Sequence, residues 1–288
     1  MKMENLKREF KRIRLVHVVI VCAVVFVAFS ILGTMLLAAG GLRKSEFSLK
    51  DSLLSSAQGK PVAVDEQVEQ DLEGLIGIKI STVSDDVFLA GGGDKVRVNL
   101  KGECRGAGEP VRLESVFRGG ELVVEVKYPR SDRGDWGRRG CSTSLTVTVP
   151  DGYRGDFAIA TVSGDLYARD LPLVLDEVKL QTVSGDIVFG VASHRELSAN
   201  TVSGDVGISY AKLADTYVKT VSGDVDITVP AGESFAVEFN SLLGVFESKH
   251  PGWPAHGVHR SVRAVRALSG EGGKLLKVST VSGDCKLR

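Results

Sequence analysis

Cysteine is scarce in this chain of 288 residues, which contains only four. Four are too few for the dense disulfide framework of a small secreted scaffold. Cys22 and Cys285 fall at apolar positions that suit a small buried side chain. Cys104 and Cys141 lie in polar, glycine-rich connections, where either a disulfide bond, which requires an oxidising compartment, or two free thiols would fit.

Net charge is also lacking, because 36 basic and 36 acidic residues cancel. Residues 1–14 contain six basic residues against Glu4 and Glu9, so this segment carries +4 and the remainder of the chain carries −4. A slightly acidic remainder argues against nucleic acid as a partner.

No residue set typical of an active site stands out either. The serines of the repeats described below have no accompanying histidine, and residues repeated identically cannot all form one active site. His250, His256 and His259 share the irregular loop 249–266, but their spacing matches no regular metal-ligand pattern. We therefore predict no enzymatic activity, no cofactor and no metal.

Long apolar runs are absent except for residues 15–39. As a helix this segment would measure about 37 Å, enough to cross a hydrocarbon core of about 30 Å. The preceding basic residues predict a cytoplasmic N-terminus and an extracytoplasmic remainder. A cleaved signal peptide is the alternative, but its apolar core is usually shorter, and residues 37–39 make a poor cleavage site. We expect an uncleaved signal-anchor, a transmembrane helix that makes this a single-pass protein of the cell membrane.

What the sequence does contain is a repeat. Thr-Val-Ser-Gly-Asp occurs identically at 161–165, 182–186, 201–205, 220–224 and 280–284. The first four copies are 21, 19 and 19 residues apart, and the last step of 60 residues equals about three periods. Diverged copies occur at 82–86, where Asp85 replaces glycine, and at 241–245. A period near 20 residues is typical of stacked supersecondary units.

Apolar residues alternate before and after each copy, which predicts two short strands joined by a corner. Glycine suits a corner that needs a positive φ, and aspartate can accept backbone hydrogen bonds there. Because one such unit buries nothing alone, the units must stack into a β-solenoid of about eight coils. We interpret the repeated glycines and aspartates as structural corner residues, with a divalent-cation ladder as the alternative for the aspartates: Gly164, Asp165, Gly185, Asp186, Gly204, Asp205, Gly223, Asp224, Gly283 and Asp284.

The chain thus divides into a cytoplasmic basic segment (1–14), a transmembrane helix (15–39), a stalk (40–74) and an extracytoplasmic β-solenoid (75–288). One polar loop, residues 129–140, combines arginines with a tryptophan and could bind an anionic polymer through charge and stacking. A solvated hairpin tip is the alternative. The candidate ligand-binding residues there are Arg130, Arg133, Trp136, Arg138 and Arg139.

The repeated corners, the strand 145–150 that ends in Val-Pro, and the glycine-rich turn 270–273 before the last copy carry a resemblance. Over residues 75–288 the chain resembles the bacterial putative-adhesin family, a domain of unknown function that includes the Lia-type envelope-stress membrane proteins. The resemblance implies a right-handed β-helix-like solenoid displayed outside the cytoplasmic membrane, and it supplies no catalytic residues.

We therefore expect a non-enzymatic membrane protein whose solenoid serves surface or envelope binding, adhesion or envelope-stress sensing. Its partners would be the cytoplasmic membrane and cell-envelope polymers or envelope proteins. A self-associating structural scaffold is the first alternative, because open sheet edges can stack between molecules. A polysaccharide-active enzyme of β-helix form is the second, and it would need a groove of acidic and basic residues in the middle of the rod.

Overall fold

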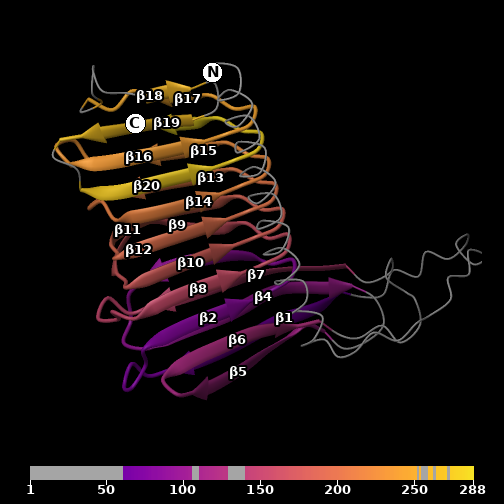
Figure 1. Cartoon of the computed structure of the whole chain (residues 1–288). Coiled ribbons are helices and arrows are strands. Elements are labelled where there is room, and N and C mark those ends of the chain that lie inside the picture. The colour runs from indigo at the N-terminus through magenta and orange to yellow at the C-terminus, as the bar shows by residue number, and fades with distance from the viewer. Residues whose placement is uncertain are drawn as a thin grey trace, which may run out of the picture.

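The computed structural model describes residues 61–105, 110–128, 140–251, 253, 259–261, 264–270 and 273–288. All regular secondary structure in these residues is β-strand (Figure 1), which confirms the predicted all-β class. Within them no helix is long and apolar enough to cross a membrane. The membrane segment expected at 15–39 lies outside the described residues.

Ten strands form the first of two sheets, sheet A, in the order β1-β4-β7-β3-β9-β11-β13-β15-β21-β17. Its strands are β1 (Val62–Gln70), β3 (Asp86–Gly91), β4 (Val96–Arg105), β7 (Gly140–Val149), β9 (Leu166–Val174), β11 (Ile187–Ser193), β13 (Val206–Tyr210), β15 (Val225–Thr228), β17 (Phe246–Ser248) and β21 (Cys285–Leu287).

Eleven strands form sheet B in the order β18-β19-β16-β20-β14-β12-β10-β8-β2-β6-β5. Its strands are β2 (Gly77–Ser81), β5 (Arg112–Arg118), β6 (Glu121–Lys127), β8 (Asp156–Ala160), β10 (Glu177–Gln181), β12 (Glu196–Asn200), β14 (Asp215–Lys219), β16 (Phe235–Asn240), β18 (His259–Ser261), β19 (Ala264–Ser269) and β20 (Lys274–Ser279).

The chain alternates between the two sheets, as a solenoid requires. Each coil contributes one strand to sheet B, passes a corner and contributes one strand to sheet A. Neighbouring coils pair in parallel and in register, for example β10 with β12 and β11 with β13. We call the corner that leads from sheet B to sheet A the motif corner, and the return from sheet A to sheet B the opposite corner.

A single core fills the space between the sheets, because apolar side chains alternate inward along most strands. In the coil of β10 and β11, for example, Val178, Leu180, Ile187 and Phe189 are all buried. The threonine of each identical motif is buried with them, at 0 to 2% exposure. A one-residue shift of any strand would turn its apolar set outward, which fixes the register.

The last coil does not follow the sequence order. β20 lies between β14 and β16, and β21 lies between β15 and β17, so the C-terminal coil is inserted ahead of the coil that precedes it in the chain. Figure 1 shows yellow β20 between β14 and orange β16. Although about three periods separate the fourth and fifth motif copies in the sequence, residues 220–224 and 280–284 are direct neighbours in space.

The N-terminal end has the same kind of inversion. β2 and β3 lie between the coil of β6 and β7 and the coil of β8 and β9. In addition, β1 pairs antiparallel with β4 over residues that the sequence appeared to place in the stalk. Because Val62–Gln70 form a strand, the stalk prediction for 40–74 is wrong over these residues. The strand is hard to recognise in the sequence, since it lies at an edge, carries few apolar residues and buries only Val64.

Candidate functional site

The motif corners form one continuous column along the rod. Each aspartate Oδ1 accepts a hydrogen bond from the backbone N–H of the corner residue in the next coil, at 2.7 to 3.0 Å. The ladder therefore offsets the repulsion between stacked carboxylates, as the structural interpretation of the aspartates requires. It runs in space through Asp86, Asp165, Asp186, Asp205, Asp224, Asp284 and Val245.

The corner glycines are needed for close approach between coils. A Cβ on Gly204 would lie 2.1 Å from the carbonyl oxygen of Gly185, and one on Gly185 would lie 2.1 Å from that of Gly164. No side chain fits at such distances. The positive φ that the sequence suggested is found at Gly223 alone among the five identical copies, so steric exclusion by the neighbouring coil explains the glycines.

The last described corner at each end of the column departs from the motif. Val245 takes the aspartate position of the final coil, and in the described residues no further corner N–H lies beyond it. At the other end Asp85 takes the glycine position. Its carboxylate is fully buried and accepts hydrogen bonds from the hydroxyls of Thr82, Tyr128 and Thr143. Burial and the Asp85 charge raise the pKa of Tyr128, which keeps this phenol a donor.

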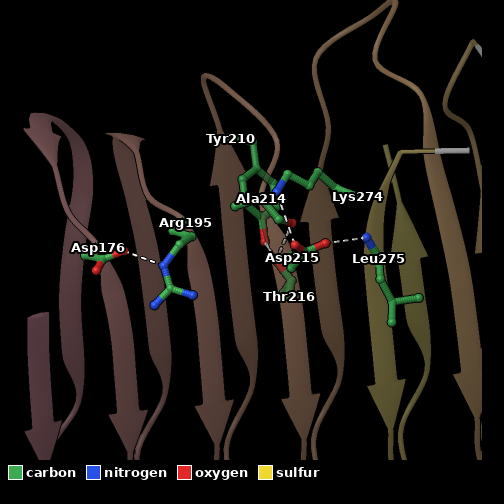
Figure 2. Close-up of polar contacts among 8 residues, drawn as sticks. All are labelled: Asp176, Arg195, Tyr210, Ala214, Asp215, Thr216, Lys274 and Leu275. Carbon is green, nitrogen blue, oxygen red and sulfur yellow. Dashed lines mark hydrogen bonds and ion pairs between the residues drawn. The ribbon is translucent and has the colours of Figure 1, made fainter.

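The opposite corners hold the inserted C-terminal coil in place by different means. Asp215 Oδ1 accepts a hydrogen bond from the Leu275 backbone N–H at 2.9 Å, and its Oδ2 pairs with Lys274 Nζ at 3.1 Å (Figure 2). Burial raises the pKa of Asp215, but these two partners outweigh it and hold the pKa below its usual value. Asp215 on β14 thus fastens β20 directly to β14.

A second pair of residues joins neighbouring coils at the same side. Arg195 Nε lies 2.5 Å from Asp176 Oδ1, as Figure 2 also shows. Both side chains are more than 45% exposed, so the pair contributes little to stability. The Asp176–Arg195 pair is not repeated from coil to coil. The Asp215 bond has a counterpart, because Asp156 Oδ1 accepts the Glu177 backbone N–H at 3.2 Å at the equivalent position of β8 and β10.

His194 lies inside the opposite corner between β11 and β12. It is 7% exposed, and its ring packs against Phe189 and Tyr210 at centroid distances of 5.7 and 5.5 Å. Neither ring nitrogen has a hydrogen-bond partner. Burial lowers the pKa of His194 to about 4, because the charged imidazolium would lose its hydration without gaining a partner.

Cys104 and Cys141 form a disulfide bond between the antiparallel neighbours β4 and β7. The structure thereby selects one of the two states that the sequence left open. The bond joins the ends of these strands next to residues 106–109 and 129–139, which lie outside the described residues. The candidate ligand residues Arg130, Arg133, Trp136, Arg138 and Arg139 all fall in the second of these segments. Cys285 is a buried free thiol, and burial raises its pKa to about 12.

The outer faces of the two sheets differ over the middle coils. On sheet A, Phe88 and Tyr167 stack at 5.2 Å with a 14° interplanar angle, and Val188 stands next to Tyr167 in register. On sheet B the outward side chains of the middle coils are mostly charged or polar, with ion pairs such as Lys179 with Glu177, and the exposed apolar residues lie toward its two ends, at Val116, Phe117, Val123 and Leu268. The sequence analysis missed the apolar strip of sheet A, although apolar residues at outward positions of alternating strands are its signal.

Chemically, the column offers a surface row of serine hydroxyls and aspartate carboxylates that repeats at each coil with an identical motif. Within the described ranges no group of three or more histidine, cysteine, aspartate or glutamate side chains is arranged to hold a metal ion. The arrangement is that of a binding or structural surface with translational repetition.

Comparison with known proteins bears on the fold. Residues 173–288 match the family model described as Toastrack DUF4097. The match covers the repeated coils from β10 onward together with the inserted C-terminal coil, and it leaves the N-terminal half of the solenoid unmatched. No curated protein matches the sequence.

Three solved structures are similar to the chain at low identity. A putative cell adhesion protein from Clostridium sporogenes has 10% identity and a TM-score of 0.48, covering 78% of this chain and 99% of its own. A putative adhesin from Bacteroides fragilis has 12% identity and a TM-score of 0.38, covering 80% and 97%. A putative lipid binding protein from Parabacteroides distasonis has 14% identity and a TM-score of 0.29, covering 78% and 97%.

Proposed function

We propose that this chain is a non-enzymatic, single-pass membrane protein that displays its solenoid outside the cytoplasmic membrane and binds cell-envelope material along the sides of the rod. The apolar segment 15–39 would be the anchor, with the basic residues 1–14 in the cytoplasm. The disulfide between Cys104 and Cys141 supports an extracytoplasmic location, since such bonds persist in oxidising compartments. We expect the coil to be right-handed, which is the hand that parallel crossover connections favour.

The observation that carries the proposal is that antiparallel strands lie at both ends of the rod while its sides stay open. At one end Val245 provides no carboxylate to continue the ladder, and the antiparallel strands β18 and β19 extend sheet B beyond β16. At the other end β1 pairs antiparallel with β4, and β5 pairs antiparallel with β6. These strands interrupt the parallel stacking of coils that end-to-end assembly would continue, so the scaffold alternative is disfavoured and side-on binding is favoured.

A sedimentation assay of the full chain with isolated cell-wall and membrane fractions tests this function, whether it serves adhesion or stress sensing. We expect saturable binding that is insensitive to calcium, because the ladder already uses one carboxylate oxygen of each aspartate. Binding that requires calcium would revive the cation-ladder interpretation. Absence of binding, together with self-association that grows with protein concentration, would contradict the proposal and favour the scaffold.

A further inference from the structure

Gly207 is the starting point. It is the second residue of β13 and faces outward on sheet A, directly between Val188 on β11 and Asp226 on β15. A glycine within a strand costs about 0.5 to 1 kcal/mol relative to alanine and often marks a place where a ligand or another backbone approaches closely. Its presence therefore needs a reason.

Packing within the molecule does not supply that reason. A Cβ on Gly207 would meet only the Ile187 carbonyl oxygen, at 4.0 Å, and its φ lies outside the range reserved for glycine. Gly204, three residues earlier, would place a Cβ 2.1 Å from a carbonyl oxygen, and Gly190 would place one 2.3 Å from Ser209 Oγ. The space above Gly207 is open, so a side chain there would be tolerated by the fold.

The residues around Gly207 are apolar on one side and polar on the others. Val188 and Asp226 flank Gly207 from strands two spacings apart, a gap of about 10 Å. Along β13 the outward neighbours are Asp205 and Ser209. The apolar strip of Phe88, Tyr167 and Val188 leads to this candidate site from β3 and β9, and Phe88 is 41% exposed. A surface that combines an apolar strip, an uncovered glycine backbone and polar side chains is suited to ligand recognition.

Charge narrows the choice of ligand. The carboxylates of the motif column run along one side of the site, and Asp226 forms another wall, paired with Arg288 at 2.6 Å. Anionic polymers would be repelled by this row. A simple cation would gain no binding energy from contact with the apolar strip. A pyranose ring has one apolar face and hydroxyl donors at its rim, and it matches both features.

We propose that the surface over Gly207 binds an uncharged glycan. One sugar ring lies on the glycine floor with its apolar face toward Val188, and its hydroxyls donate to Asp205 and Asp226 and exchange a hydrogen bond with Ser209. The neighbouring sugar of the chain packs on Tyr167. This inference rests on the proposed envelope-binding function and names its ligand class and its site.

The test is a titration of the full chain with tetramers of β-1,4-linked glucose and of N-acetylglucosamine, with polyphosphate as the anionic control. Gly207→Val fills the floor with a residue that favours strands, and Gly207→Ala fills it partly. The matched control is Ala158→Val, an outward position of β8 on sheet B. We expect the wild type to bind at least one tetramer and not polyphosphate. Gly207→Val should weaken binding at least tenfold, Gly207→Ala less, and Ala158→Val not at all, with melting temperatures no lower than that of the wild type.

Two results would overturn the inference. One is equal tetramer binding by the wild type and Gly207→Val. The other is a wild type that takes up envelope fractions but neither tetramer, in which case the envelope-binding function stands and the glycan site does not. A wild type that binds neither fractions nor tetramers contradicts both proposals.

Discussion

The two corners of each coil perform the same task under different constraints. At the motif corner the backbones of adjacent coils approach so closely that a Cβ would lie about 2 Å from a carbonyl oxygen, and five coils use the same five residues. The opposite corner varies more: the corner between β11 and β12 buries His194 and pairs Arg195 with Asp176, while Asp156 and Asp215 each accept a backbone N–H from the neighbouring coil. Sequence identity therefore follows steric constraint, and looser corners leave the sequence free to vary.

The largest effect should come from breaking the tight corner. Gly204→Ala would place a Cβ 2.1 Å from the Gly185 carbonyl oxygen, while Gly207→Ala in the same coil meets nothing closer than 4.0 Å. We expect Gly204→Ala to destabilise by about 3 kcal/mol or more, since overpacking next to rigid backbone cannot relax. Gly207→Ala should be neutral or slightly stabilising. Chemical denaturation of the two variants measures the difference, and equal stabilities would refute the steric explanation.

Reduction of the disulfide tests the end of the rod where no identical corner exists. Cys104 and Cys141 enclose a sequence separation of 37 residues. Loss of this cross-link should cost about 2 to 4 kcal/mol through the entropy of the unfolded chain. Thermal unfolding of the chain with and without reductant, compared with a Cys104→Ser/Cys141→Ser variant, gives the value. An unchanged melting temperature would mean that the hydroxyl network around Asp85 suffices to hold this end.

The stability contributed by the opposite corner should be the part that is most sensitive to acid. His194 has its pKa lowered to about 4 by burial, so the unfolded chain binds its proton first. Stability should be fully present above pH 6.5 and fall as the pH decreases toward 4, by about 3 kcal/mol. His194→Phe should remove this slope. Asp215, whose pKa is lowered, adds a loss only below its usual pKa near 4, so an unaltered slope between pH 6.5 and 4.5 in His194→Phe would rule out His194 as the cause.

The smallest effect distinguishes the middle of the column from its end. Asp205 accepts the Asp224 N–H, whereas Val245 has no corner N–H to accept within the described residues. Asp205→Ala should cost about 1 kcal/mol by leaving a donor unpaired. Asp205→Asn keeps an acceptor and should cost less, and Val245→Ala should be nearly neutral. Urea midpoints rank the three variants, and an Asp205→Ala midpoint equal to that of Val245→Ala would argue against the ladder.

The repeat by itself determined much of the molecule. Strand alternation and the Thr-Val-Ser-Gly-Asp period fixed the all-β solenoid, the inward and outward faces and the column of corners, because these depend on local geometry repeated at each coil. The strand β1 was not predicted, because an edge strand with one buried valine has almost no alternation of apolar and polar residues. The apolar strip and the open space over Gly207 escaped because they combine residues from β3, β9, β11 and β13.

Only the tertiary structure decided the order of the coils. The sequence spacing of 241–245 after 220–224 fits direct stacking just as well as the true neighbour, 280–284. Asp224 and Asp215 on the preceding coil bind the C-terminal coil at both of its corners, and Val245 can occupy only the last position because it lacks a carboxylate. Which N–H meets which carboxylate depends on contacts between segments 60 residues apart, and a local pattern carries no information on that choice.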